Sequence, residues 1–127
     1  MTLTYVSDGT GTSGLGVTSV GSQTINVSGN VYQVAQPAFA STTVNLGNVR
    51  VGGTAQQAVG ITNTNVAPAG FQEGLSASLG GATGGISANG NFTNLVAGGT
   101  NNSALVVGLD TATAGARTGS ATVNLVS

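Results

Sequence analysis

The sequence contains no cysteine, histidine, lysine or tryptophan, and its charged residues are two arginines and three acids. Without cysteine and histidine it has neither the usual zinc ligands nor a Ser-His-Asp triad. Two arginines cannot form the basic surface that nucleic acids or anionic membranes require. No apolar run approaches the roughly 20 residues of a membrane-spanning helix. We therefore expect a protein that is not an enzyme, has no cofactor, does not bind nucleic acid and is not inserted in a membrane.

The low charge does not predict disorder. Disordered segments combine low hydrophobicity with high net charge, whereas this chain is 39% hydrophobic with a formal net charge of -1. Short runs of β-branched and apolar residues alternate with clusters of Gly, Asn, Ser and Thr, a pattern typical of β-sandwiches. We predict an all-β, Ig-like antiparallel β-sandwich with an N-terminal strand or hairpin arm. The predicted strands are residues 3–6, 23–27, 30–34, 42–49, 55–63, 75–79, 92–96, 104–109 and 119–126.

The strand pattern also predicts a turn and a core. Residues 27–31 (VSGNV) are typical of a tight hairpin turn, because Gly29 or Asn30 can adopt a positive φ. Val44 and Leu46 alternate with polar neighbours, as in a half-buried strand. The residues that we predict to be largely buried are Val44, Leu46, Val59, Ile61, Leu105, Val107, Leu109, Val123 and Leu125.

The two ends of the chain carry the same short pattern. Residues 2–7 (TLTYVS) match residues 122–127 (TVNLVS) in register. We interpret the sequence as a repeat array cut inside a repeat, with Met1 as an added start. On this hypothesis residues 1–36 are an arm that ends one repeat, and residues 37–127 are the Ig-like body of the next.

Several motifs are shared with a known family. In the body they are residues 43–53 (TVNLGNVRVGG), 60–65 (GITNTN), 108–115 (GLDTATAG) and 120–125 (SATVNL), and in the arm residues 6–11 (VSDGTG) and 23–32 (QTINVSGNVY). The chain thereby resembles the bacterial choice-of-anchor D repeat, an Ig-like domain of the ASPM–SPD-2–Hydin type. The resemblance implies a sandwich of about seven or more strands in a secreted or surface-anchored protein. It supplies no catalytic residue, and in that family the body precedes the closing hairpin.

The acids and the glycine-rich stretch are the candidates for metal and dinucleotide sites. Asp8 and Asp110 are weak candidates for a metal site, because calcium needs about six to eight oxygens and the three acids are scattered. The alternative is that Asp8 starts a turn and that Asp110 forms an Asx turn at a strand end. Residues 9–14 (GTGTSG) match the GxGxxG pattern, but no helix pattern follows to complete a dinucleotide site. We interpret this stretch as a loop between strands.

The low charge and the displaced hairpin together favour self-association. Proteins normally protect strand edges with lysine, proline or bulges, and this chain has no lysine. The body can accept the hairpin of its own chain or that of the next chain, and the second choice makes a head-to-tail filament. We predict an extracellular or cell-surface structural module that polymerises with copies of itself; the alternative is a monomeric adhesive or carbohydrate-binding module. The predicted assembly residues are Leu3, Tyr5, Val6, Ile25, Val27, Val31, Tyr32 and Val34.

Overall fold

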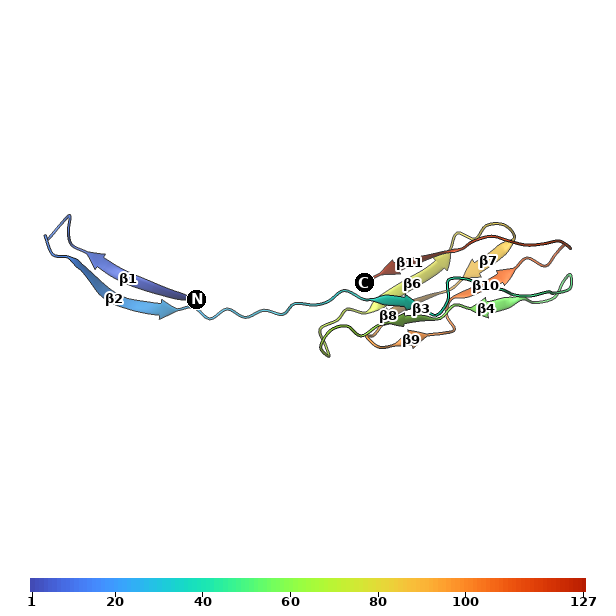
Figure 1. The fold of residues 1–127 in the computed structure, drawn as a ribbon, viewed down its shortest axis with the longest axis horizontal. Coiled ribbons are helices and arrows are strands. Elements are labelled where there is room, and N and C mark those ends of the chain that lie inside the picture. Colours follow the sequence, from blue (N-terminus) through green and yellow to red (C-terminus); the bar gives the residue numbers. More distant parts are fainter. The chain divides into compact units, whose positions relative to one another are not determined.

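The computed structural model describes residues 1–127 and consists of β-strands and loops (Figure 1). No helix in it is long and apolar enough to span a membrane. The chain divides into two compact units, a first unit Met1–Asn30 and a second unit Val31–Ser127. The all-β fold with antiparallel sheets confirms the predicted fold class. The predicted boundary after residue 36 falls inside the second unit.

The first unit is a β-hairpin. Strand β1 (Thr2–Asp8) pairs with β2 (Val17–Thr24) in antiparallel register, with a bulge where the pairing shifts between Tyr5 and Val6. The connecting loop is closed by the Gly9 carbonyl, which accepts hydrogen bonds from the amides of residues 12, 13 and 14. Gly14 has a φ of 72°, a left-handed conformation that glycine adopts at no steric cost.

The hairpin predicted within residues 23–34 was wrong. Strand β2 ends at Thr24, and residues 25–32 belong to no strand. Neither Gly29 nor Asn30 adopts the positive φ that a tight turn needs. The glycine-rich loop before β2 supplies that conformation instead, so the hairpin closes earlier in the chain.

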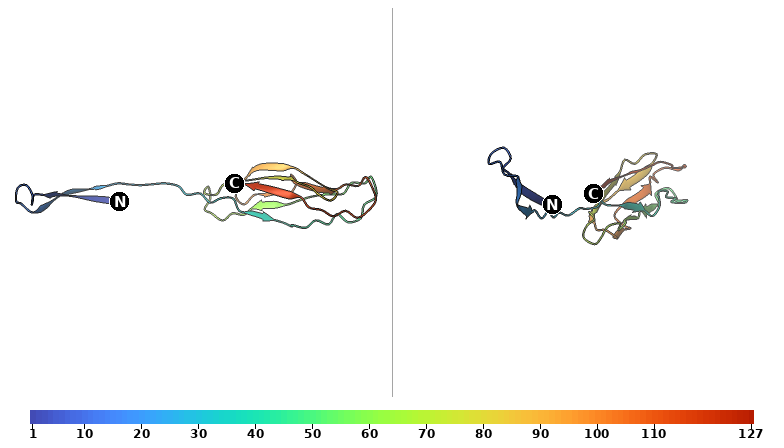
Figure 2. Two further views of the ribbon diagram at one scale, coloured as in Figure 1. Left: turned by 90° about the horizontal axis from the view of Figure 1, so that it is seen from above. Right: turned by 60° about the vertical axis from the view of Figure 1, so that its left-hand side comes forward.

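Nine strands form three antiparallel sheets in the second unit (Figure 1). Their bounds are β3 Pro37–Phe39, β4 Gln56–Ala58, β5 Ile61–Asn63, β6 Leu75–Gly80, β7 Ile86–Asn89, β8 Asn91–Leu95, β9 Thr100–Asn101, β10 Val106–Leu109 and β11 Thr122–Val126. The sheet orders are β4-β10-β7, β3-β5-β9 and β11-β6-β8. β11 runs toward the C terminus, which lies at the same end of this unit as the start of β3 (Figure 1, Figure 2).

The core of the sandwich lies between β6 and the strands β5 and β10. Alternate side chains of β6 point inward, so that Leu75, Ala77 and Leu79 are buried while their neighbours are not. They pack with Ile61 and Leu105, which are both fully buried, as the sequence predicts.

The predicted core was wrong for Leu125, whose side chain is 37% exposed. It lies on β11, which pairs only with β6 and is uncovered on its other side. The remaining predicted core residues are half-buried, namely Val44, Leu46, Val59, Val107, Leu109 and Val123.

Besides those of the misplaced hairpin, two predicted strands differ from the observed ones in more than their end residues. Residues 42–49 form no strand, because no neighbouring segment pairs with them. Residues 55–63 are divided into β4 and β5, which belong to different sheets. The division falls at Val59 and Gly60, whose backbones bond Leu105 and Ala40 respectively.

Candidate functional site

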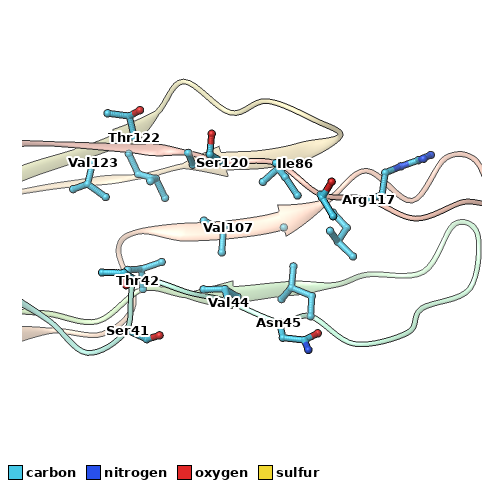
Figure 3. Close-up of a pocket in the computed structure, with 18 of the residues that line it drawn as sticks. Ser41, Thr42, Val44, Asn45, Ile86, Val107, Arg117, Ser120, Thr122 and Val123 are labelled. Carbon is cyan, nitrogen blue, oxygen red and sulfur yellow. The ribbon is translucent and has the colours of Figure 1, made fainter.

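A groove of about 880 Å³ runs along one side of the second unit (Figure 3). One wall is formed by residues 41–47, the other by residues 117–123, and we call the space between them the edge groove. Val107 lies between the two walls, with Val44 on one side and Val123 on the other (Figure 3). The apolar side chains that line its interior are Val59, Leu79, Ile86, Val107 and Leu109. The groove therefore exposes part of what would be the interior of a closed sandwich.

The first wall is an extended segment without a strand partner. No backbone hydrogen bond joins residues 42–49 to another segment. The amides of Thr43 and Gly47 bond only to nearby side chains, those of Ser41 and Asn45. Unpaired backbone groups of this kind are available to an incoming strand.

The second wall leads into β11, and only its last two residues, Thr122 and Val123, belong to that strand. The Leu79 amide of β6 donates to the carbonyl of Gly90, on the β8 side. The backbone groups of its neighbours Ser78 and Gly80 therefore face β11. Their partners on β11 are Asn124 and Thr122. Because successive residues of a strand point their backbone groups to opposite sides, the groups of the odd-numbered residues of β11 point outward. No strand pairs with this edge.

The structure places three of the predicted assembly residues on β1. Leu3 is half-buried, whereas Tyr5 and Val6 are exposed. The next two follow β2: Ile25 exchanges backbone hydrogen bonds of 2.8 and 3.2 Å with Met1 and is 44% exposed, and Val27 is 83% exposed.

The other three belong to the second unit. Val31 and Val34 are exposed, and the ring of Tyr32 lies 5.6 Å from that of Phe71. The backbone of Gln33 bonds to Phe71 and Glu73 at 2.8 and 2.9 Å. Five of the eight residues thus belong to the first unit and three to the second, and these three do not line the edge groove.

Sequence reasoning missed Asn63, the only fully buried polar side chain. Its amide nitrogen donates to the carbonyls of Glu73 and Leu95, at 3.1 and 2.9 Å. Its oxygen accepts from the Gln36 amide and the Gln72 side chain, both at 3.0 Å. Its position in the sequence could have indicated its burial. Asn63 follows Val59 and Ile61 on the face of the predicted strand that points inward.

Asp8, Asp110 and Arg117 each bond to nearby residues of the chain. Asp8 accepts hydrogen bonds from the amide and hydroxyl of Thr10, and Asp110 accepts one from the amide of Ala112, so each closes its own turn. No three potential metal ligands lie together. Arg117 donates to the carbonyls of Asp110 and Thr113, not to a carboxylate.

A search of family models, curated proteins and solved structures finds no match to this chain. The features of the chain that bear on its function are the edge groove, the unpaired backbone groups beside it and the exposed apolar residues of the arm.

Proposed function

We propose that the protein is a structural module that polymerises with copies of itself, head to tail, by strand exchange. In this proposal the edge groove of one copy accepts an extended segment from the arm of another. The module would belong to an extracellular or cell-surface repeat protein of bacteria, in keeping with its resemblance to the choice-of-anchor D repeat. The observation that carries the proposal is a groove with an apolar interior, an unpaired extended segment along one wall and the unpaired edge of β11 at the end of the other.

The groove has the chemistry of a strand-acceptor site. A strand laid along β11 would satisfy the backbone groups that now face outward, as in recognition by β-strand addition. Its alternate side chains would cover Val59, Val107 and their neighbours. Burial of one valine or isoleucine side chain contributes roughly 1.5–3 kcal/mol. Two such side chains and a short ladder therefore supply several kcal/mol toward association.

The arm has the chemistry of a donor. An isolated two-stranded hairpin is only marginally stable in water, and every residue of β2 is exposed. After β2, Ile25 and Val27 alternate with polar Asn26 and Ser28, so that one face of an extended strand is apolar. A formal net charge of -1 provides little repulsion between copies.

The alternative, an adhesive or carbohydrate-binding module, has less support. Sugar sites usually combine a concave surface with exposed aromatic rings. Tyr5 and Tyr32 are both exposed, but neither lines the edge groove, where Phe39 is the only aromatic residue.

The test is electron microscopy and light scattering of the full chain at increasing concentration. We expect linear polymers whose length increases with concentration. The double variant I25D/V27D should remain monomeric, because two carboxylates would have to enter an apolar groove. The matched control N26D/S28D adds the same charge on the opposite face of the segment and should still polymerise. A full chain that stays monomeric at high concentration, or equal assembly of both variants, would refute the proposal.

A further inference from the structure

We infer that β2 of one copy pairs with β11 of the next in the register that β1 holds within its own hairpin. In a free copy, β1 then occupies the edge of β2 that β11 of another copy would pair with. β1 must therefore separate from β2 before assembly. This inference rests on the proposed function and specifies which strands exchange.

β1 and β11 match in sequence and in the direction of their backbone groups. Residues 2–7 repeat residues 122–127 in sequence. Met1 exchanges hydrogen bonds with Ile25, so Met1, Leu3 and the other odd-numbered residues at the start of β1 face β2. Their equivalents on β11 are also odd-numbered and face its outer edge. The same backbone groups are thus bonded in β1 and unpaired in β11.

Hydrogen bonds beyond the strand support this assignment. The Ser120 carbonyl accepts a bond of 2.9 Å from the Thr83 amide. Thr83 lies just beyond β6 in the chain, so the groups of Ser120 face the β6 side. The backbone groups of the next residue, Ala121, therefore face outward. Ala121 is the equivalent of Met1, whose backbone groups face β2.

The register fixes which side chains enter the edge groove. Thr2 pairs with Thr24 in the hairpin, so Thr24 would pair with Thr122. Continuing in antiparallel order, Ile25 lies opposite Ala121 and Val27 opposite Gly119. Residues opposite each other share a face of the sheet. Ala121 and Gly119 both line the groove, so the residues across from them would lie on the groove side of the sheet.

Exchange also explains how β1 can be displaced. β1 and β11 would use the same edge of β2, so the two cannot pair with it together. The hydrogen bonds between β1 and residues 18–24 are replaced by equivalent ones from β11. The net free energy of exchange comes from the segment that follows β2. Ile25 and Val27 are 44% and 83% exposed and become covered in the groove.

Engineered disulfides test the register, because the chain has no native cysteine. Thr24 and Thr122 would form a non-hydrogen-bonded pair, with Cα atoms about 4.5 Å apart, within the range that a disulfide bridges. We expect oxidised T24C/T122C polymers to give a covalent ladder on a non-reducing gel. The control T24C/N124C is two residues out of register and should give monomers. Equal ladders from both variants would overturn the register.

A second variant tests the displacement of β1. In T2C/T24C, oxidation locks β1 onto β2, and the sedimenting fraction should fall to that of I25D/V27D. Reduction should restore it to that of the original chain. If the locked chain assembles as well as the reduced one, the displacement of β1 is refuted while the proposed function survives. If the reduced chain does not assemble either, the proposed function fails, and this inference fails with it.

Discussion

At the scale of single residues, Asn63 is where the second unit depends most on hydrogen bonding. Asn63→Ala would leave the buried carbonyls of Glu73 and Leu95 without their donor. A buried polar group without a partner costs about 1–3 kcal/mol. We expect the free energy of unfolding to fall by about 3 kcal/mol in denaturant titrations. The exposed Asn102→Ala should change little, and equal losses in the two variants would contradict this role.

Leu105 and Leu125 were both predicted to be buried, but their replacement by alanine should destabilise the protein to different extents. Leu105 is fully buried in the core, and Leu105→Ala should cost about 2–5 kcal/mol of unfolding free energy. Leu125 is 37% exposed on the edge strand, so Leu125→Ala in the unassembled chain should cost less than half as much. Chemical denaturation of the two variants at low protein concentration measures the difference. Similar losses would mean that the outer side of β11 is covered.

In the hairpin loop, hydrogen bonds to the carboxylate of Asp8 lower its pKa. The Thr10 hydroxyl, and then the Thr10 amide, donate to the Asp8 carboxylate and hold its pKa below the ordinary value. The loop stabilisation is therefore complete above the unfolded pKa of about 3.9 and is lost as pH falls through the lower folded pKa. An NMR titration should show a higher Asp8 pKa in Thr10→Val than in Thr10→Ser, which keeps the hydroxyl. The same pKa in both variants would contradict this cause.

At the scale of elements, the sequence predicted which residues alternate but not which strands pair. Val44 and Leu46 are half-buried, as their alternation indicates, yet residues 42–49 have no partner and form no strand. Alternation is a property of one segment, whereas pairing depends on a neighbour. The short strand β9, Thr100–Asn101, is defined only by its bonds to β5 and has no pattern of its own.

Ile25 and Val27 were predicted as assembly residues from the sequence pattern, and the structure leaves both exposed. Their role in assembly stays a prediction. The edge groove was not predictable, because Val44, Val107 and Val123 meet there from three distant parts of the chain. The hairpin was misplaced because the residues of the VSGNV motif are typical of a tight turn. Pairing depends on both strands, and β2 pairs with β1 and not with the segment after the motif.

At the scale of the whole molecule, the scarcity of charge predicts how assembly responds to salt. Strand exchange depends on backbone hydrogen bonds and apolar burial, and the formal net charge is only -1. Charges are screened within about 3 Å at 1 M ionic strength. We expect the sedimenting fraction in 1 M NaCl to equal or exceed that in 0.1 M NaCl. Loss of polymer at high salt would show that ion pairs hold the copies together.

Cutting the arm after residue 30 and after residue 36 should affect the second unit differently. Deletion of residues 1–30 removes the first unit, whereas deletion of residues 1–36 also removes Ala35 from the core and the Gln36 amide from Asn63. We expect the shorter deletion to leave a folded monomer that no longer assembles. The longer deletion should be less stable than the shorter one by about 2–4 kcal/mol, from the lost apolar burial and hydrogen bonds.

Sedimentation and denaturant titration of both deletion variants measure the two effects separately. A synthetic peptide of residues 17–29 should bind the shorter deletion variant and raise its melting temperature, because it carries β2 and the segment that would enter the edge groove. A matched peptide with aspartate at positions 25 and 27 should not. If the variant without residues 1–30 polymerises like the full chain, the donor lies elsewhere, because no arm strand would remain to enter the groove.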